Sequence, residues 1–242
     1  MEIEGNRKRQ TVRTRALLWA LASACAIALC AAPAAGAWPS FAPLAKPGKP
    51  PIHSDHISYG HKRERQMAGY SNRHYGKREF RLKRPKVIVL HFTATDSYDA
   101  VWSTFDSNAP NVGELPGVCS HYVIEQNGTI DELVPPRIRC RHAIGLNHVA
   151  IGIEMVQSTG RGAHWADQQI LQRKHQARSA LHLVRWLQGR YSIPTGEVIG
   201  HAMANDDPHF KDLEGWRNDH TDWLRSDVKK FRHRLRRMLH HD

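Results

Sequence analysis

The chain has 242 residues, a length that suits one domain with additional segments or two small domains. Of these residues 40% are hydrophobic, and the formal net charge is +12. The charge is uneven: residues 1–85 carry a net +11, residues 86–225 a net −3 and residues 226–242 a net +4. Because the positive charge lies outside the mildly acidic central part, we expect no nucleic-acid partner. Basic arms on an exported protein would instead suit electrostatic contact with an anionic envelope.

The N-terminal segment has the pattern of a secretory signal. Five arginine and lysine residues precede a mostly apolar run over residues 16–32, and the small residues Ala34-Ala35-Gly36-Ala37 follow. We predict a signal peptide over residues 1–37 and a periplasmic or secreted protein. A retained membrane anchor is the less favoured alternative, because about 17 apolar residues rich in alanine are few for a bilayer of about 30 Å.

Residues 38–84 are expected to form a linker or arm. The first part, residues 38–51, contains five prolines, which is typical of an extended linker. The second part, residues 52–84, is rich in histidine, arginine and lysine and has little apolar periodicity. We expect it to be loosely ordered or to wrap the domain surface, so that the folded domain begins near Pro85.

Strand patterns recur from residue 86 onward. A short β-branched run spans residues 87–90, and Asn127-Gly128 separates two further runs in the manner of a hairpin turn. The two runs of the hairpin are residues 121–125 and 129–134, and the remaining predicted strands are residues 150–156 and 197–200.

One long helix is predicted after Asp167, which we take as its N-cap. Apolar residues between Ile170 and Leu187 follow a 3.6-residue spacing that stops near Tyr191. A basic helix or tail is expected over residues 227–242. Strands interleaved with a long helix indicate an α/β fold with a single mixed β-sheet flanked by helices, preceded by the signal peptide and basic linker.

Three reactive side chains lie near the carboxyl ends of predicted strands, namely His91, Glu154 and His201. Sites in open α/β sheets are usually built at that edge. A hydrolytic zinc site needs three protein ligands, a fourth position open for water and a separate carboxylate that carries a proton. The two histidines offer two ligands and Glu154 offers the carboxylate.

The third ligand is expected in the stretch "WRNDHTDW". It contains Asp219, His220 and Asp222, and elementary chemistry does not choose among them.

Several motifs occur in the order of a known family between Lys86 and Trp223: "VIVLHFTAT", "SHYVIEQNGTIDELVP", "RHAIGLNHVAIGIEMV", "VIGHAMANDDPHF" and "HTDW". The chain resembles the zinc-dependent N-acetylmuramoyl-L-alanine amidases of the amidase-2 and peptidoglycan-recognition type. The resemblance implies an amidase domain over residues 85–226. It also implies a substrate, peptidoglycan or a muropeptide, whose amide bond between N-acetylmuramic acid and L-alanine is hydrolysed with Zn²⁺ as cofactor.

The resemblance also implies a role for individual residues. It assigns the zinc ligands to His91, His201 and Asp222 and the proton-transferring base to Glu154. His220 stands where the family often has a lysine that stabilises the oxyanion, so a hydrogen bond from the imidazole is expected to serve instead.

Further positions are implied around the cleft. His142 matches a cleft-lining histidine of the family, with support of a ligand as the alternative. Substrate contacts are also expected from Thr93 and His121. Cys119 and Cys140 remain after removal of the leader and are expected to form a disulfide in an oxidising compartment, with free buried thiols or a metal role as alternatives.

Two other interpretations compete with the enzyme. A recognition module would bind wall fragments without cutting them, but the two histidines, the aspartate and Glu154 favour catalysis. A zinc peptidase with a His-Glu-x-x-His helix is disfavoured, because that motif does not occur in the sequence. We expect the protein to be a monomer.

Overall fold

The computed structural model describes residues 47–238, so the predicted signal peptide, its membrane-anchor alternative and the start of the linker lie outside the described residues. The strands are β1 (His53–Ser54), β2 (Val87–Phe92), β3 (Tyr122–Ile124), β4 (Ile130–Glu132), β5 (Ala150–Met155) and β6 (Val198–Gly200). The helices are α1 (His61–Tyr75), α2 (Tyr98–Asp106), α3 (Ala163–Gln172), α4 (Lys174–Tyr191) and α5 (Arg225–Met238), with short 3₁₀ turns η1 (Thr195–Glu197) and η2 (His201–Asp206).

The strands form one six-stranded sheet in the order β1-β4-β3-β5-β2-β6. The hairpin of β3 and β4 is antiparallel, whereas β1–β4, β3–β5, β5–β2 and β2–β6 pair in parallel. The predicted α/β fold with a single mixed sheet and flanking helices is therefore confirmed. The parallel pairing also brings the carboxyl ends of β2, β5 and β6 to one edge.

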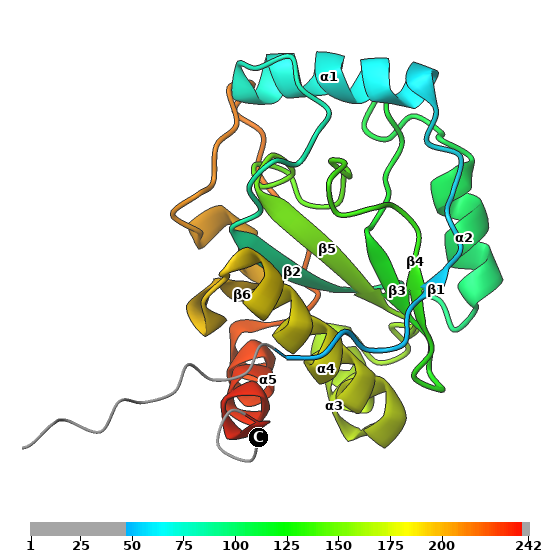
Figure 1. The fold of residues 1–242 in the computed structure, drawn as a ribbon, viewed down its shortest axis with the longest axis vertical. Coiled ribbons are helices and arrows are strands. Elements are labelled where there is room, and N and C mark those ends of the chain that lie inside the picture. Colours follow the sequence, from blue (N-terminus) through cyan, green and yellow to red (C-terminus); the bar gives the residue numbers. More distant parts are fainter. Residues whose placement is uncertain (1–46, 239–242) are drawn as a thin grey trace, which may run out of the picture. The chain divides into compact units, whose positions relative to one another are not determined.

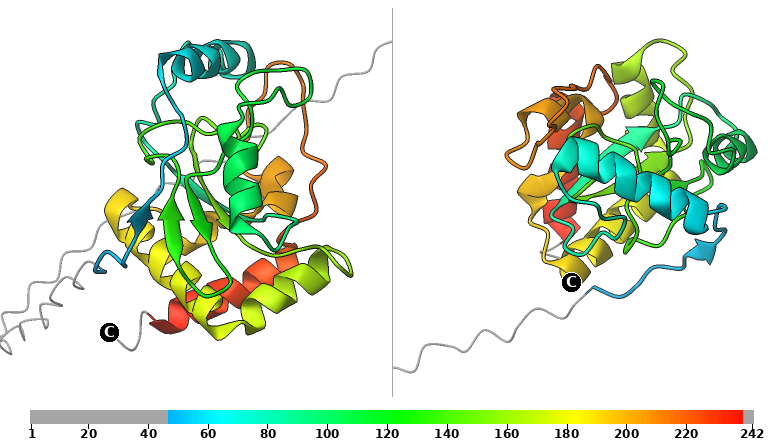
Figure 2. Two further views of the ribbon diagram at one scale, coloured as in Figure 1. Left: turned by 90° about the vertical axis from the view of Figure 1, so that its right-hand side faces the viewer. Right: turned by 90° about the horizontal axis from the view of Figure 1, so that it is seen from above.

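The two faces of the sheet are covered by different helices. Tyr122 and Ile124 belong to the main core with α3, α4 and α5, which lie together in Figures 1 and 2, whereas Val123 packs in a second cluster with residues of α2. Successive side chains of a strand point to opposite faces. Glu154 is in register with both Val123 and His91, so the two polar side chains emerge on the face of Val123.

The predicted long helix is divided into α3 and α4. The chain turns at Arg173, whose backbone is extended with φ −76° and ψ 99°. Asp167 is not an N-cap, as the sequence suggested, but a buried residue within α3. Its carboxylate accepts hydrogen bonds from the backbone N–H groups of Trp223 (3.1 Å) and Leu224 (3.0 Å), so it satisfies donors just ahead of α5. The predicted end near Tyr191 is confirmed.

Helix α1 lies where an arm was expected. Of the two alternatives, loose order is wrong for residues 61–75, because Met67, Tyr70 and Tyr75 are buried and pack with Phe80. Their spacing of three to eight residues places them on one helical face. The helix ends at Gly76, which adopts a left-handed conformation with φ 72°.

Three further features of the domain are its last helix, the length and apolar character of its helices, and a disulfide. The C-terminal segment predicted as a basic helix or tail forms helix α5 in its described part. Within residues 47–238, none of the helices combines the length and apolar character that a membrane span requires. Cys119 and Cys140 are joined by a disulfide, with their Cα atoms 5.3 Å apart.

Candidate active site

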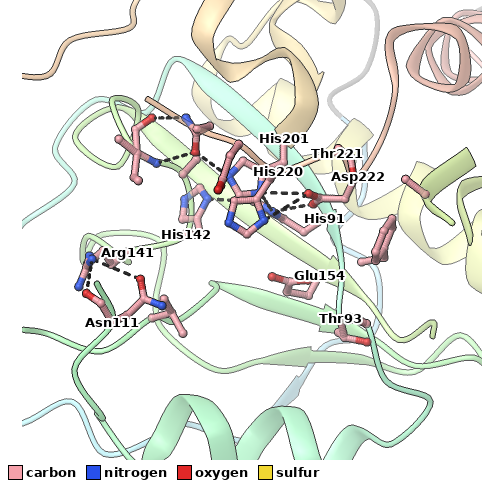
Figure 3. A pocket seen from close by; sticks show the side chains of 18 of the residues that line it. His91, Thr93, Asn111, Arg141, His142, Glu154, His201, His220, Thr221 and Asp222 are labelled. Atoms are coloured by element: carbon pink, nitrogen blue, oxygen red, sulfur yellow. Dashed lines mark hydrogen bonds and ion pairs between the residues drawn. The ribbon is translucent and has the colours of Figure 1, made fainter. Parts of the chain in front are cut away.

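Three buried side chains converge at the sheet edge (Figure 3). His91 comes from β2, His201 begins η2 directly after β6, and Asp222 precedes α5. The Nδ1 atoms of the two histidines are 3.0 Å apart, and each lies 3.2 Å from a different carboxylate oxygen of Asp222. The donor atoms of all three residues lie within 4.8 Å of one another.

This donor set fits a zinc ion. Bonds of about 2.0–2.1 Å in a tetrahedral arrangement place ligand atoms about 3.3 Å apart, close to the separations seen between His91, His201 and Asp222. Two imidazoles and one carboxylate also leave the fourth position that a catalytic zinc site keeps open. Burial, reinforced by the neighbouring His201, lowers the pKa of His91 to about 4, which favours the neutral imidazole that a metal needs.

His142 fixes the orientation of His91. Nδ1 of His142 lies 3.1 Å from Nε2 of His91, and Nε2 of His142 lies 3.4 Å from the backbone oxygen of Ala150. A carbonyl can only accept, so the proton of His142 belongs on Nε2 and its Nδ1 accepts from Nε2–H of His91. That tautomer leaves Nδ1 of His91 free to bind a metal. His142 also lines the cavity, so it lies both in the cleft wall and next to a candidate ligand, the two positions expected for it.

Asn218 does the same for His201. Nε2 of His201 lies 2.8 Å from Oδ1 of Asn218. The amide orientation is fixed by Ile144, whose N–H donates to Oδ1 (3.1 Å) and whose carbonyl accepts from Nδ2 (2.7 Å). Oδ1 is thus the acceptor, and Nδ1 of His201 faces the other ligands. Sequence reasoning missed Asn218, although it lies within the motif that supplied the third ligand.

A close backbone approach places Asp222. Its carbonyl accepts from the N–H of Ala202 (2.9 Å), and the next residue, Trp223, donates from Nε1 to the carbonyl of His91 (3.2 Å). A Cβ atom at Gly200 would lie only 1.8 Å from the backbone oxygen of Trp223. Glycine at the end of β6 therefore lets the segment with Asp222 and Trp223 approach the backbone directly before His201.

Glu154 lies beside the three converging residues without belonging to them. It is buried on β5, in register with His91, and Figure 3 shows it in the same cavity. Within the described part of the chain its Oε2 atom has no hydrogen-bond partner. Burial, reinforced by the charge of Asp222, raises its pKa well above the usual value. An unpartnered carboxyl group with a raised pKa is suited to taking up and releasing a proton.

His220 lies at the opening of the cavity. Its ring stacks on that of His201 with centroids 4.1 Å apart and an interplanar angle of 17°, and its side chain is 58% exposed. Nδ1 lies 3.8 Å from Oδ1 of Asp222. Asp219, the remaining ligand candidate, is exposed, so the structure brings Asp222 and not Asp219 to the histidine pair.

Of the two further residues expected to contact substrate, Thr93 lies at the cavity and His121 does not. Thr93 lines the cavity, but its hydroxyl donates to the carbonyl of Thr95 (2.8 Å) and accepts from the N–H of Gln157 (3.1 Å). His121 does not line the cavity. It is fully buried, its Nδ1 accepts from Gly152 N–H (3.0 Å) and its Nε2 lies 2.9 Å from the backbone oxygen of Ile138, so it stabilises backbone.

The cavity has a volume of about 660 Å³. Arg141 and Asn111 lie on the side of the cavity opposite His91 and Asp222 (Figure 3). The buried guanidinium of Arg141 donates to the carbonyls of Asn111, Glu114 and Pro116 at 2.9 Å each. Arg141 therefore holds the loop that forms this wall.

The chain matches one protein family and is similar to several solved structures. The family model described as N-acetylmuramoyl-L-alanine amidase matches residues 81–212. Among solved structures, the endolysin amidase LysCS from Clostridium intestinale URNW is similar at 18% identity and a TM-score of 0.48, over 76% of this chain and 96% of that one. An AmpD derivative is similar at 13% identity and a TM-score of 0.47, over 77% and 97%. No curated protein matches.

Proposed function

Because the chain belongs to the N-acetylmuramoyl-L-alanine amidase family, whose model covers more than half of it, we propose that it is a zinc-dependent peptidoglycan amidase with His91, His201 and Asp222 as ligands. The bond cleaved joins N-acetylmuramic acid to the L-alanine of the stem peptide. The observation that carries this proposal is the convergence of three buried donor groups beside an unpartnered buried glutamate, Glu154.

We assign one or more residues to each step of the hydrolysis. His91, His201 and Asp222 would hold the zinc ion, which would act as a Lewis acid toward the scissile carbonyl and lower the pKa of water. Glu154 accepts a proton from water while the water oxygen attacks the carbonyl carbon. Glu154 then gives this proton to the amide nitrogen as the C–N bond breaks, so a free amine leaves. His220, at the cavity opening, donates a hydrogen bond to the oxygen that becomes negative. His142 and Asn218 keep the two ligand histidines in the required tautomers.

The surroundings in which the enzyme acts form part of the proposal. The signal-like leader supports export to the periplasm or the medium, where the wall is accessible. Helix α5 presents exposed basic side chains, among them Arg234, Arg236 and Arg237, that suit contact with an anionic envelope. We propose that the protein acts there as a monomer on peptidoglycan or released muropeptides.

The test is digestion of purified peptidoglycan with the purified protein, with and without a zinc chelator, and analysis of the products by mass spectrometry. The proposal predicts stem peptides that begin at L-alanine, uncut glycan chains, inhibition by the chelator and recovery on addition of zinc. A zinc-loaded sample that binds peptidoglycan but releases no peptide would favour the non-catalytic recognition module instead.

A further inference from the structure

Helix α1 is one of the described elements that the family match leaves out, together with β1 and α5. It lies across the end of the domain away from α3 and α5 (Figures 1 and 2) and precedes the matched residues 81–212. Its inner face buries two basic side chains, Arg63 (2% exposed) and His74 (0% exposed). Buried basic groups need partners, and the partners of these two lie in loops around the cavity.

Arg63 holds the ends of one loop together. Its guanidinium donates to the carbonyls of Phe105 (2.7 Å), Gly117 (3.3 Å) and Val118 (3.0 Å). Phe105 and Val118 line the cavity, and the segment between them contains Asn111 and the carbonyls that Arg141 binds. Charged donors to three carbonyls restrain both ends of this wall at once.

Tyr70 supports a second segment. Its hydroxyl accepts from Nδ2 of Asn147 (3.3 Å), and Oδ1 of Asn147 accepts from the N–H groups of His142 and Ala143 at 2.8 Å each. The turn that carries His142 is therefore connected to α1. The guanidinium of Arg141 also lies over the ring of Tyr70, 4.9 Å from its centroid.

His74 joins the first loop to a third. Its Nε2 lies 2.9 Å from Oε2 of Glu114, and its Nδ1 lies 2.8 Å from Oδ2 of Asp212. A carboxylate only accepts, so each ring nitrogen of His74 faces an acceptor. Glu114 belongs to the loop that faces the zinc ligands, and Asp212 opens the segment that leads to Asn218 and His220. One buried ring thus connects two walls of the cavity.

We propose that Arg63, Tyr70 and His74 form a clamp, the α1 clamp, that sets the separation of the cavity walls, and that His74 is a positioning residue for substrate binding. The inference rests on the proposed amidase function. His91, His201 and Glu154 stand at the carboxyl ends of strands, whereas the partners of the clamp lie in loops and at the end of α2. Loosening the clamp is therefore expected to weaken substrate binding more than it slows the chemical step.

The test uses His74→Gln in the full chain. Glutamine keeps one hydrogen bond but cannot bridge both carboxylates. We expect KM for a soluble muropeptide to rise about tenfold, as for loss of a hydrogen bond that orders a binding loop, with a smaller change in kcat and with zinc content unchanged. Hydrogen exchange should accelerate in residues 107–118 and 207–217. Leu187→Ala is the matched control, because it destabilises α4 on the other face of the sheet and should leave KM unchanged.

A second variant keeps the proposal testable where His74→Gln does not fold. Glu114→Gln alters a partly exposed partner and should accelerate exchange in residues 107–118 while residues 207–217 stay protected. Unchanged KM and unchanged exchange in the folded variants would overturn the clamp. Wild-type protein without cleavage would overturn the proposed function instead, and the exchange measurements would still decide on the clamp.

Discussion

The two sides of the cavity are built in different ways. The side that holds His91, His201 and Glu154 consists of the neighbouring parallel strands β5, β2 and β6, so its chemistry stands on hydrogen-bonded strands. The opposite side is irregular chain held by the disulfide, by Arg141 and by helix α1. The difference separates two tasks: rigid strand ends fix the reacting groups, and restrained loops fix the space for the substrate.

Loss of a metal ligand should give the largest effect and would test the strand side directly. Asp222→Ala removes the carboxylate that touches both histidines, so we expect loss of bound zinc and amide hydrolysis at background level. Zinc content by elemental analysis and peptide release by mass spectrometry provide the measurement. Asp206→Asn, an exposed carboxylate paired with Arg225, is the control and should behave as wild type. Normal zinc content in Asp222→Ala would remove it from the ligand set.

Glu154→Gln should separate catalysis from metal binding. The side chain keeps its size, but it no longer carries a proton between water and amine, so we expect kcat to fall about 10²–10⁴-fold. Zinc content and thermal stability should not fall, because Glu154 lies outside the three converging donors. The matched control is Glu125→Gln, at the end of the neighbouring strand, which should leave kcat unchanged. Undiminished hydrolysis by Glu154→Gln would reject its role.

A smaller effect is expected from Asn218→Ala, which leaves every ligand in place. Without the amide, Nε2 of His201 loses its acceptor and the ring loses its fixed tautomer, so zinc affinity should fall about 10–100-fold. Competition with a chromogenic chelator measures the affinity. Excess zinc should restore most of the activity, and an unchanged affinity would show that the ring is held by its stacking on His220 alone.

The strand side was largely predictable from sequence. Short apolar runs identify the strands, and a polar residue at the end of a run identifies a side chain at the sheet edge, as for His91, Glu154 and His201. The third ligand was not predictable in this way, because Asp219, His220 and Asp222 share one irregular segment. Family resemblance selected Asp222, and the structure brings it to the histidines.

The loop side was not predictable. The apolar face of α1 is diluted by charged residues, and the partners of His74 lie 40 and 138 residues further along the chain. No local pattern reports such contacts. The same reason explains Asn218, whose role depends on Ile144, and His121, whose two ring nitrogens are used by distant backbone groups.

Removal of the disulfide should have the smallest effect on activity. It tests how the loop side of the cavity is held, because the disulfide and α1 restrain the same loop. Replacement of both Cys119 and Cys140 by alanine opens a link across 21 residues, and the free energy of unfolding should fall by about 3 kcal/mol in chemical denaturation. The ratio kcat/KM at low temperature should change little, because Arg63 still binds Gly117 and Val118 next to the missing link. A fall in kcat/KM larger than that of His74→Gln would instead make the covalent link, and not α1, the restraint on this wall.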